Sequence, residues 1–78
     1  MTETRLRAAW DLAKRKLART SQYPTMDLAF EIGVDRTTVY RWMNAKHKPM
    51  PVYIARIDAA FSQILGDDWT DQVERVLN

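Results

Sequence analysis

Apolar residues recur along this chain at the three- to four-residue spacing of an α-helix. The first run predicts a helix from about Glu3 to Arg19. Its apolar stripe is formed by residues within an arc of about 100°, namely Leu6, Ala9, Trp10, Ala13 and Leu17. Four basic residues gather on a neighbouring flank, Arg5, Arg15, Lys16 and Arg19. This flank is either a solvated surface or a source of contacts to a polyanion.

Proline and glycine mark the ends of two short helices that follow. The first begins either with Pro24 in its first turn or with Thr25 as its cap. Gly33 ends it, because glycine readily adopts a left-handed backbone. The second short helix extends over about 36–44, and Asp35 is a suitable N-cap for it.

Two further helices complete the predicted architecture. One begins near Pro51 and ends at Gly66, and its apolar stripe holds Ile54, Ile57, Phe61, Ile64 and Leu65. The other spans about 68–77, is capped by Asp67 or Asp68, and carries Trp69, Val73, Val76 and Leu77. No stretch predicts a strand. We therefore expect an all-α fold of five helices, forming a single domain over residues 1–78.

Composition narrows the class of protein. The chain has 78 residues, of which 46% are hydrophobic and 28% charged, so intrinsic disorder is not expected. It contains no cysteine, which excludes disulfides and thiolate metal sites. No apolar run approaches the ~20 residues that span a bilayer, and the N-terminal sequence does not look like a secretory leader. We expect a soluble, cytoplasmic protein of a bacterial or phage-infected cell, with no membrane partner.

Charge is unevenly distributed along the chain. Residues 1–50 contain ten Lys or Arg against five Asp or Glu, whereas residues 51–78 contain two against five. This split suggests one surface for a polyanion and a different surface for another partner.

The segment from about 25 to 44 carries the most specific signal. Two short helices meet there through a turn containing Gly33, and the small residue Ala29 allows a close crossing. Helix, short turn with glycine, and helix is the pattern of a helix-turn-helix motif.

This motif resembles the lambda-repressor-like family, which includes phage Cro proteins and lysogeny repressors. The matching positions are Ala29, Gly33, Val34, Val39 and Trp42. The family continues with Trp, two residues, Gly, three residues and Pro; here Trp42 and Pro49 match, but Ala45 replaces the glycine. If the backbone at Ala45 is left-handed, alanine strains it by ~1 kcal/mol. The resemblance implies a compact five-helix domain with the helix-turn-helix at its second and third helices.

In such a motif the second short helix lies in the major groove of DNA. If Val39 and Trp42 face the core, the outward residues are Arg36, Thr37, Tyr40, Arg41 and Asn44. The resemblance implies that Arg36, Thr37, Tyr40 and Arg41 occupy the positions with which the family reads bases, and that Asn44 does so less regularly. Tyr40 either faces a base or packs over a neighbouring helix, and Asn44 either contacts DNA or ends the helix. Thr38, at the edge, hydrogen-bonds its own backbone, binds a phosphate or contacts a base.

Phosphate contacts are expected on both sides of this helix. The candidates are Thr25, at the N-terminus of the first motif helix, with Thr38 and the loop residues Lys46, His47 and Lys48. The loop is alternatively a flexible, solvated segment. His47 has no second His and no Cys nearby, so a metal or catalytic role is not expected. Nothing predicts an enzyme, a cofactor or a small-molecule ligand.

The C-terminal helix has two interpretations. Trp69, Val73, Val76 and Leu77 are either a lid on the small core or the contact surface of a homodimer. The sequence therefore predicts a sequence-specific, double-stranded DNA-binding transcriptional regulator, most simply a small Cro-like phage or prophage repressor that dimerises on an inverted-repeat operator. The alternative is a protein-interaction module on the same scaffold, an antitoxin or inhibitor that binds a protein through its acidic C-terminal helix.

Overall fold

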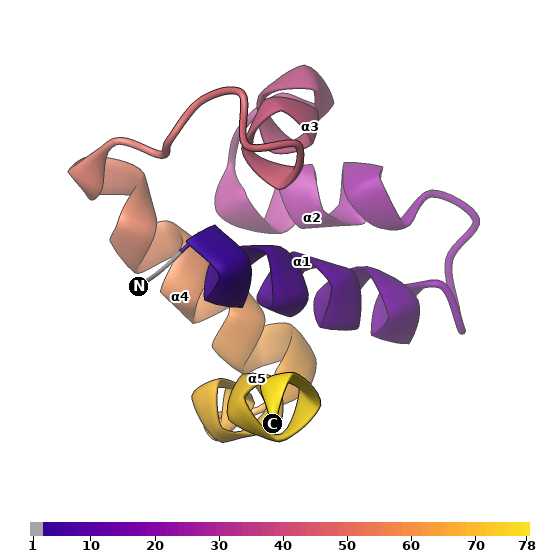
Figure 1. Cartoon of the computed structure of the whole chain (residues 1–78). Coiled ribbons are helices and arrows are strands. Elements are labelled where there is room, and N and C mark those ends of the chain that lie inside the picture. The colour runs from indigo at the N-terminus through magenta and orange to yellow at the C-terminus, as the bar shows by residue number, and fades with distance from the viewer. Residues whose placement is uncertain (1–2) are drawn as a thin grey trace.

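The computed structural model describes residues 3–78, and these residues form five α-helices with no strand among them (Figure 1). In chain order the helices are α1 (Glu3–Leu17), α2 (Pro24–Ile32), α3 (Arg36–Met43), α4 (Pro51–Leu65) and α5 (Trp69–Leu77). The predicted all-α class is confirmed. None of these helices combines the length and the apolar character needed to cross a membrane.

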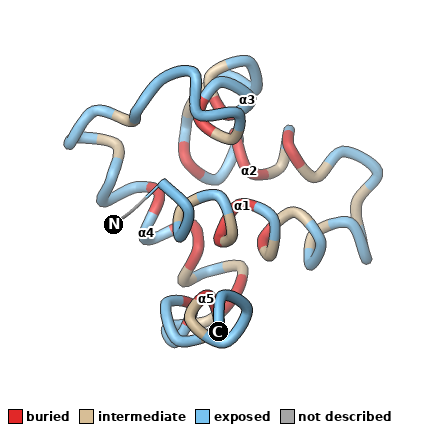
Figure 2. Tube along the Cα trace, in the orientation of Figure 1, coloured by how far each residue is buried: buried red, intermediate tan, exposed pale blue. Residues whose placement is uncertain are grey.

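Helix α1 is the centre of the fold and contacts each of the other four helices. Ala9 and Ala13 are fully buried on it, and their small side chains let neighbouring helices approach closely. Figure 1 shows α2 and α3 on one side of α1 and α5 on the other. Figure 2 shows the buried residues on the inward sides of the helices, whereas the connection from α3 to α4 is largely exposed.

A chain of aromatic rings runs through the core and links four helices. Trp10 of α1 lies between Trp42 of α3, with ring centroids 6.2 Å apart, and Phe61 of α4, at 4.8 Å. Phe61 in turn contacts Trp69 of α5 at 5.1 Å, edge to face. Edge-to-face pairs contribute about 0.5–1.5 kcal/mol beyond the area they bury. These contacts fix α3 and α5 to the same core.

Helix ends follow the expected local chemistry in most places. Pro24 occupies the first turn of α2, which settles the choice left open by the sequence. Gly33 and Gly66 follow α2 and α4 with positive φ of 84° and 106°. The Asp35 side chain accepts a hydrogen bond of 3.2 Å from the Thr37 N–H, so Asp35 is the predicted N-cap of α3.

Three expectations need correction. Helix α1 ends at Leu17 rather than Arg19, because the chain turns over residues 18–20. Asp68 precedes α5, but no side-chain hydrogen bond caps that helix. Ile54, placed by its spacing in the core stripe of α4, is 49% exposed. It lies in the first turns of α4, which border a cleft rather than the packed core.

Helix α5 closes one side of the core. Trp69 and Val73 are buried at 4% and 2% exposure, whereas Val76 and Leu77 are exposed at 56% and 41%. The structure thus matches the lid interpretation for Trp69 and Val73, which lie inside the single chain. Of the four apolar residues of α5, Val76 and Leu77 lie on the surface, where they can contact a second molecule, because the core ends before the last turn of the helix.

Candidate nucleic-acid interface

The connection between α2 and α3 is three residues long and tightly closed. Gly33 has φ 84° and ψ 35°, a left-handed backbone that glycine adopts without steric cost. The N–H groups of Gly33 and Val34 both donate to the carbonyl oxygen of Ala29, at 2.8 and 3.0 Å. These bonds end α2 and turn the chain, so that Asp35 caps the next helix two residues after Gly33. Helix α3 then packs against α2.

Helix α3 has one buried and one exposed side. Val39 and Trp42 are buried at 0% and 7% exposure and hold the helix on the core. The opposite side lies within an arc of about 140° and carries four of the predicted base-reading residues, all exposed, Arg36, Thr37, Tyr40 and Arg41. The fifth, Asn44, directly follows the helix and is exposed as well. Thr38 lies at the edge, half-buried. Sequence reasoning therefore assigned both sides of α3 correctly.

Two of these side chains had alternative interpretations. Tyr40 is 47% exposed, so its ring is not sequestered by a neighbouring helix. Asn44 follows the last residue of α3, and its N–H donates to the carbonyl oxygen of Tyr40 at 3.0 Å. Asn44 thus ends the helix with its backbone while its side chain stays at the surface.

The backbone after α3 is left-handed at Ala45, where φ is 58°. The Ala45 N–H donates to the carbonyl of Trp42 at 3.1 Å, and the Lys46 N–H donates to that of Arg41 at 2.9 Å. This pair of bonds is a Schellman motif, whose left-handed residue is usually glycine. Alanine therefore strains the position by about 1 kcal/mol, but the motif still forms and fixes where the basic loop leaves α3.

The loop residues Lys46, His47 and Lys48 are exposed, as a phosphate-binding loop requires. The chain segment around them carries no negative side chain, since residues 36–57 contain no Asp or Glu. The cations on α3 and this loop are Arg36, Arg41, Lys46 and Lys48. None of them forms an ion pair with another described residue. Their charge is available to an external anion.

Other predicted phosphate contacts are placed less favourably. The Thr25 side chain is buried at 6% exposure, so only backbone donors at the N-terminus of α2 remain for an anion there. On the basic flank of α1, Arg5 pairs with Glu74 of α5 and Arg15 pairs with Asp11. Half of the basic residues predicted on that flank are thus engaged within the chain.

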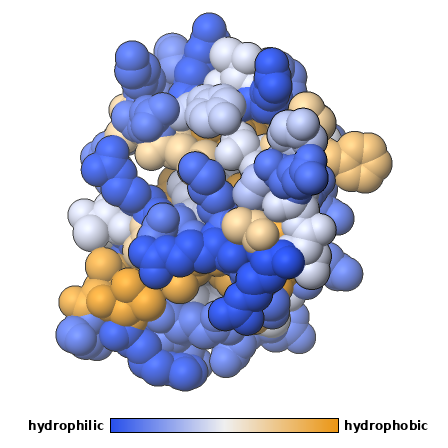
Figure 3. All heavy atoms as spheres, turned by 90° about the vertical axis from the view of Figure 1, so that its right-hand side faces the viewer, coloured by the Kyte–Doolittle hydropathy of each residue, from blue (hydrophilic) through white to orange (hydrophobic). Residues whose placement is uncertain are grey.

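The exposed side of α3 and the end of α5 belong to different regions of the surface. Figure 1 shows α3 and α5 at opposite ends of the molecule, and the two helices do not contact each other. In the space-filling view of Figure 3, hydrophilic side chains cover the upper end, at the level of α3. Hydrophobic side chains gather lower down, at the level of α5.

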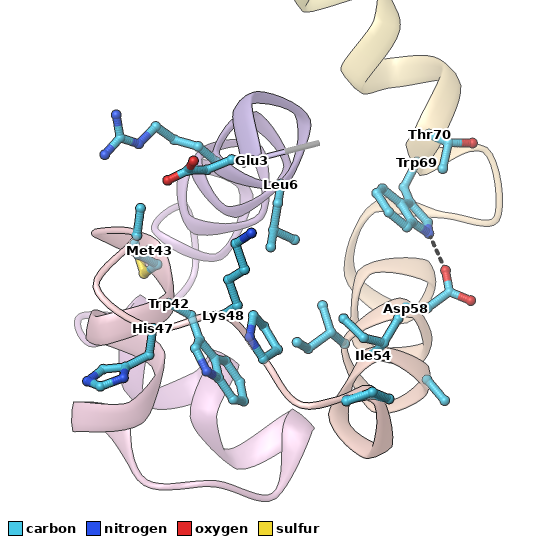
Figure 4. A pocket seen from close by; sticks show the side chains of 16 residues that line it. Glu3, Leu6, Trp42, Met43, His47, Lys48, Ile54, Asp58, Trp69 and Thr70 are labelled. Atoms are coloured by element: carbon cyan, nitrogen blue, oxygen red, sulfur yellow. Dashed lines mark hydrogen bonds between the residues drawn. The ribbon is translucent and has the colours of Figure 1, made fainter. Parts of the chain in front are cut away.

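The structure also contains a cleft that sequence reasoning missed. It has a volume of about 930 Å³ and lies between the first turns of α1, the loop after α3, and the first turns of α4 and α5 (Figure 4). Its walls come from segments far apart in the chain, so no local spacing pattern signals it. Among residues 3–78, no three His, Cys, Asp or Glu side chains are grouped closely enough to hold a metal ion.

Comparison of the chain with protein-family models, curated proteins and solved structures found no match. Function is therefore inferred from the residues and their geometry.

Proposed function

We propose that this protein is a sequence-specific regulator that binds double-stranded DNA, most simply a small Cro-like repressor, and that it reads the major groove with α3. One observation carries the proposal. The exposed side of α3 and the residue after it present five hydrogen-bonding side chains, Arg36, Thr37, Tyr40, Arg41 and Asn44, in a segment, residues 36–57, that contains no Asp or Glu. The resemblance of residues 29–49 to the lambda-repressor-like family supports the same function.

The chemistry of this side suits base edges. The guanidinium groups of Arg36 and Arg41 can each form two hydrogen bonds to guanine O6 and N7, and the amide of Asn44 can do so with adenine. The Thr37 methyl group suits contact with a thymine methyl. Each pairing with two hydrogen bonds is worth about 1–3 kcal/mol of discrimination against the wrong base.

Lys46, His47 and Lys48 supply contacts to the DNA backbone in this proposal. Contacts to phosphates set the register of the protein on DNA but do not distinguish sequences. They also make affinity fall with salt, because each neutralised phosphate releases condensed counterions. The Schellman motif at Ala45 holds this loop at the end of α3, where the adjacent phosphates lie when a helix occupies the groove.

A single α3 reads only a short site, so specificity gains from a second subunit on an inverted repeat. Val76 and Leu77 are the exposed apolar residues of α5 and are proposed as the core of a two-fold contact.

The exposed apolar end of α5 also favours a second candidate function. A protein partner bound at α5 would lie away from α3, so the chain could act as an antitoxin or inhibitor with or without DNA.

The direct test is selection of binding sites from a random duplex library at about 150 mM salt, followed by sequencing. We expect an enriched inverted repeat whose half-sites are centred about ten base pairs apart. Repeating the selection with Arg41→Ala should lose preference at one position in each half-site. If neither protein enriches any sequence, base reading by α3 is excluded, and α5 becomes the surface on which to seek a protein partner.

A further inference from the structure

The cleft between α1, α4 and α5 has the size and lining of a small-molecule site. Its volume of about 930 Å³ lies within the ~300–1,000 Å³ typical of ligand pockets. Large apolar side chains line it from four helices, Leu6, Trp42, Ile54, Ile57 and Trp69. Figure 4 shows the indoles of Trp42 and Trp69 on opposite sides of this space.

The cleft exists because the connection from α3 to α4 passes around it without filling it. Pro49 and Pro51 restrict the backbone on both sides of Met50, which is extended with φ −65° and ψ 151°. Ile54 follows one turn later, and it remains 49% exposed although its spacing belongs to the apolar stripe of α4. An apolar ligand body in the cleft would cover this side chain.

The charges around the cleft favour an anion. Figure 4 shows the Lys48 side chain ending beside Leu6, at the edge of the space that Ile54 borders from the other side. Arg7 also lines the cleft, and neither cation forms an ion pair with another described residue.

The two acidic residues of the lining do not neutralise Lys48. The Asp58 carboxylate accepts a hydrogen bond from Trp69 Nε1 at 2.9 Å, on the far side of the cleft. The Glu3 carboxylate is directed away from the space in the same view. Lys48 therefore carries a positive charge at the edge of this space that no described carboxylate pairs with.

We propose that this cleft binds a small amphipathic organic anion, with a flat apolar body between Trp42 and Ile54 and a carboxylate or sulfonate group on Lys48. The indole and aliphatic walls would exclude water from the body of the ligand. The ion pair with Lys48 would then select an anion over a neutral molecule of the same shape.

Occupancy would also affect the surface beside α3. Lys48 and His47 line the cleft and belong to the loop proposed to contact DNA phosphates. A ligand anion on Lys48 would compete with a phosphate for the same charge, so it would lower the affinity for DNA. This regulatory step rests on the proposed function, whereas binding in the cleft does not.

The test uses 8-anilino-1-naphthalenesulfonate, a flat anion whose fluorescence rises in apolar surroundings, titrated against the folded chain. We expect saturable binding of one dye per chain. Lys48→Ala should weaken it about five- to tenfold, whereas Lys46→Ala, in the same loop but outside the cleft lining, should change it less than about twofold. Ile54→Glu should abolish binding, and Val52→Glu, which is exposed two residues earlier and lies outside the lining, should not.

Circular dichroism establishes that each variant is folded before its titration is compared. Absence of saturable binding to the wild-type chain overturns the proposal, and so does equal binding by the Lys48 and Lys46 variants. N-phenyl-1-naphthylamine is a neutral analogue, and binding as tight as that of the sulfonate would overturn selection for an anion.

The regulatory step is tested with the selected DNA site. The sulfonate should lower the affinity of the wild-type chain for DNA and leave that of Lys48→Ala unchanged. Equal effects on both chains would overturn competition at Lys48. If the chain selects no DNA site at all, the proposed function fails, and the dye titrations still decide whether the cleft binds an anion.

Discussion

The indole N–H of Trp69 donates a 2.9 Å hydrogen bond to the carboxylate of Asp58, which joins the first turn of α5 to the middle of α4. The same indole packs edge to face on Phe61. A short C-terminal helix of this kind gains little stability from its own backbone, because nine residues are too few to form a stable helix alone. The position of α5 therefore depends on tertiary contacts, and Trp69 with its two partners supplies some of them beside the buried Val73 and the ion pair between Arg5 and Glu74.

Loss of the acceptor should weaken the attachment of α5. Asp58→Ala is expected to lower the free energy of unfolding by about 1–2 kcal/mol, since the bond is made to a charged group and is only partly buried. Asp58→Asn keeps an acceptor oxygen and should lose less. Urea denaturation followed by tryptophan fluorescence measures both. Unfolding midpoints for Asp58→Ala equal to the wild type would show that the bond contributes nothing.

The left-handed residue after α3 offers a stabilising substitution. Ala45→Gly removes about 1 kcal/mol of steric strain from the folded state at φ 58°. Glycine also raises the conformational entropy of the unfolded chain, which offsets part of this stabilisation. The expected net stabilisation is up to about 0.5 kcal/mol, measured by thermal denaturation. Gly33→Ala, at φ 84°, is the opposite change and should destabilise by about 1–2 kcal/mol. A destabilised Ala45→Gly would indicate that the alanine methyl makes contacts that outweigh the strain.

The residues proposed to read bases and those proposed to contact the DNA backbone should differ in the salt dependence of their variants. Arg36→Ala or Arg41→Ala is expected to lose about 1–3 kcal/mol on the selected site and little on random DNA. Lys46→Ala should weaken both by similar factors and reduce the slope of log affinity against log salt by about one. Fluorescence anisotropy with labelled duplexes at several salt concentrations measures these quantities. If Arg41→Ala weakens binding to the selected site and to random DNA equally, Arg41 contacts the DNA backbone and does not read a base.

The two halves of the α5 stripe should respond differently to substitution. Val73→Ala, inside the core, is expected to lower stability by about 2 kcal/mol, because it removes two buried carbon atoms and leaves a cavity. Val76→Asp with Leu77→Asp should leave stability nearly unchanged and weaken binding to the inverted repeat more than binding to a half-site. Denaturation and sedimentation on and off DNA distinguish these effects. Unchanged binding of the double variant to the inverted repeat would exclude α5 as the dimer contact.

Most of the fold could be predicted from local signals. Gly33, Asp35, Pro51 and Gly66 are residues whose backbone preferences or side-chain donors and acceptors act within a few positions, so they placed the helix ends closely. The exposed and buried sides of α3 followed from Val39 and Trp42 in the same way. Local periodicity is sufficient wherever a helix packs along its whole length.

Prediction failed where packing stops partway along a helix. Ile54 continues an apolar stripe of α4 in which Ile57, Phe61 and Leu65 are buried, yet it is exposed because no neighbouring segment covers it. Spacing along one helix cannot show where its neighbour ends. The cleft escaped prediction for the same reason, since its walls meet only when α1, α4 and α5 have packed.

The division of α3 into two sides has an evolutionary consequence. The packing of the helix depends on Val39 and Trp42, whereas the residues on its exposed side contribute little to stability, since surface substitutions usually change it by less than about 0.5 kcal/mol. Duplicated copies of such a gene can therefore diverge freely at Arg36, Tyr40 and Arg41 while the two anchors stay constant. Related chains would then share one scaffold and differ in the molecules they recognise.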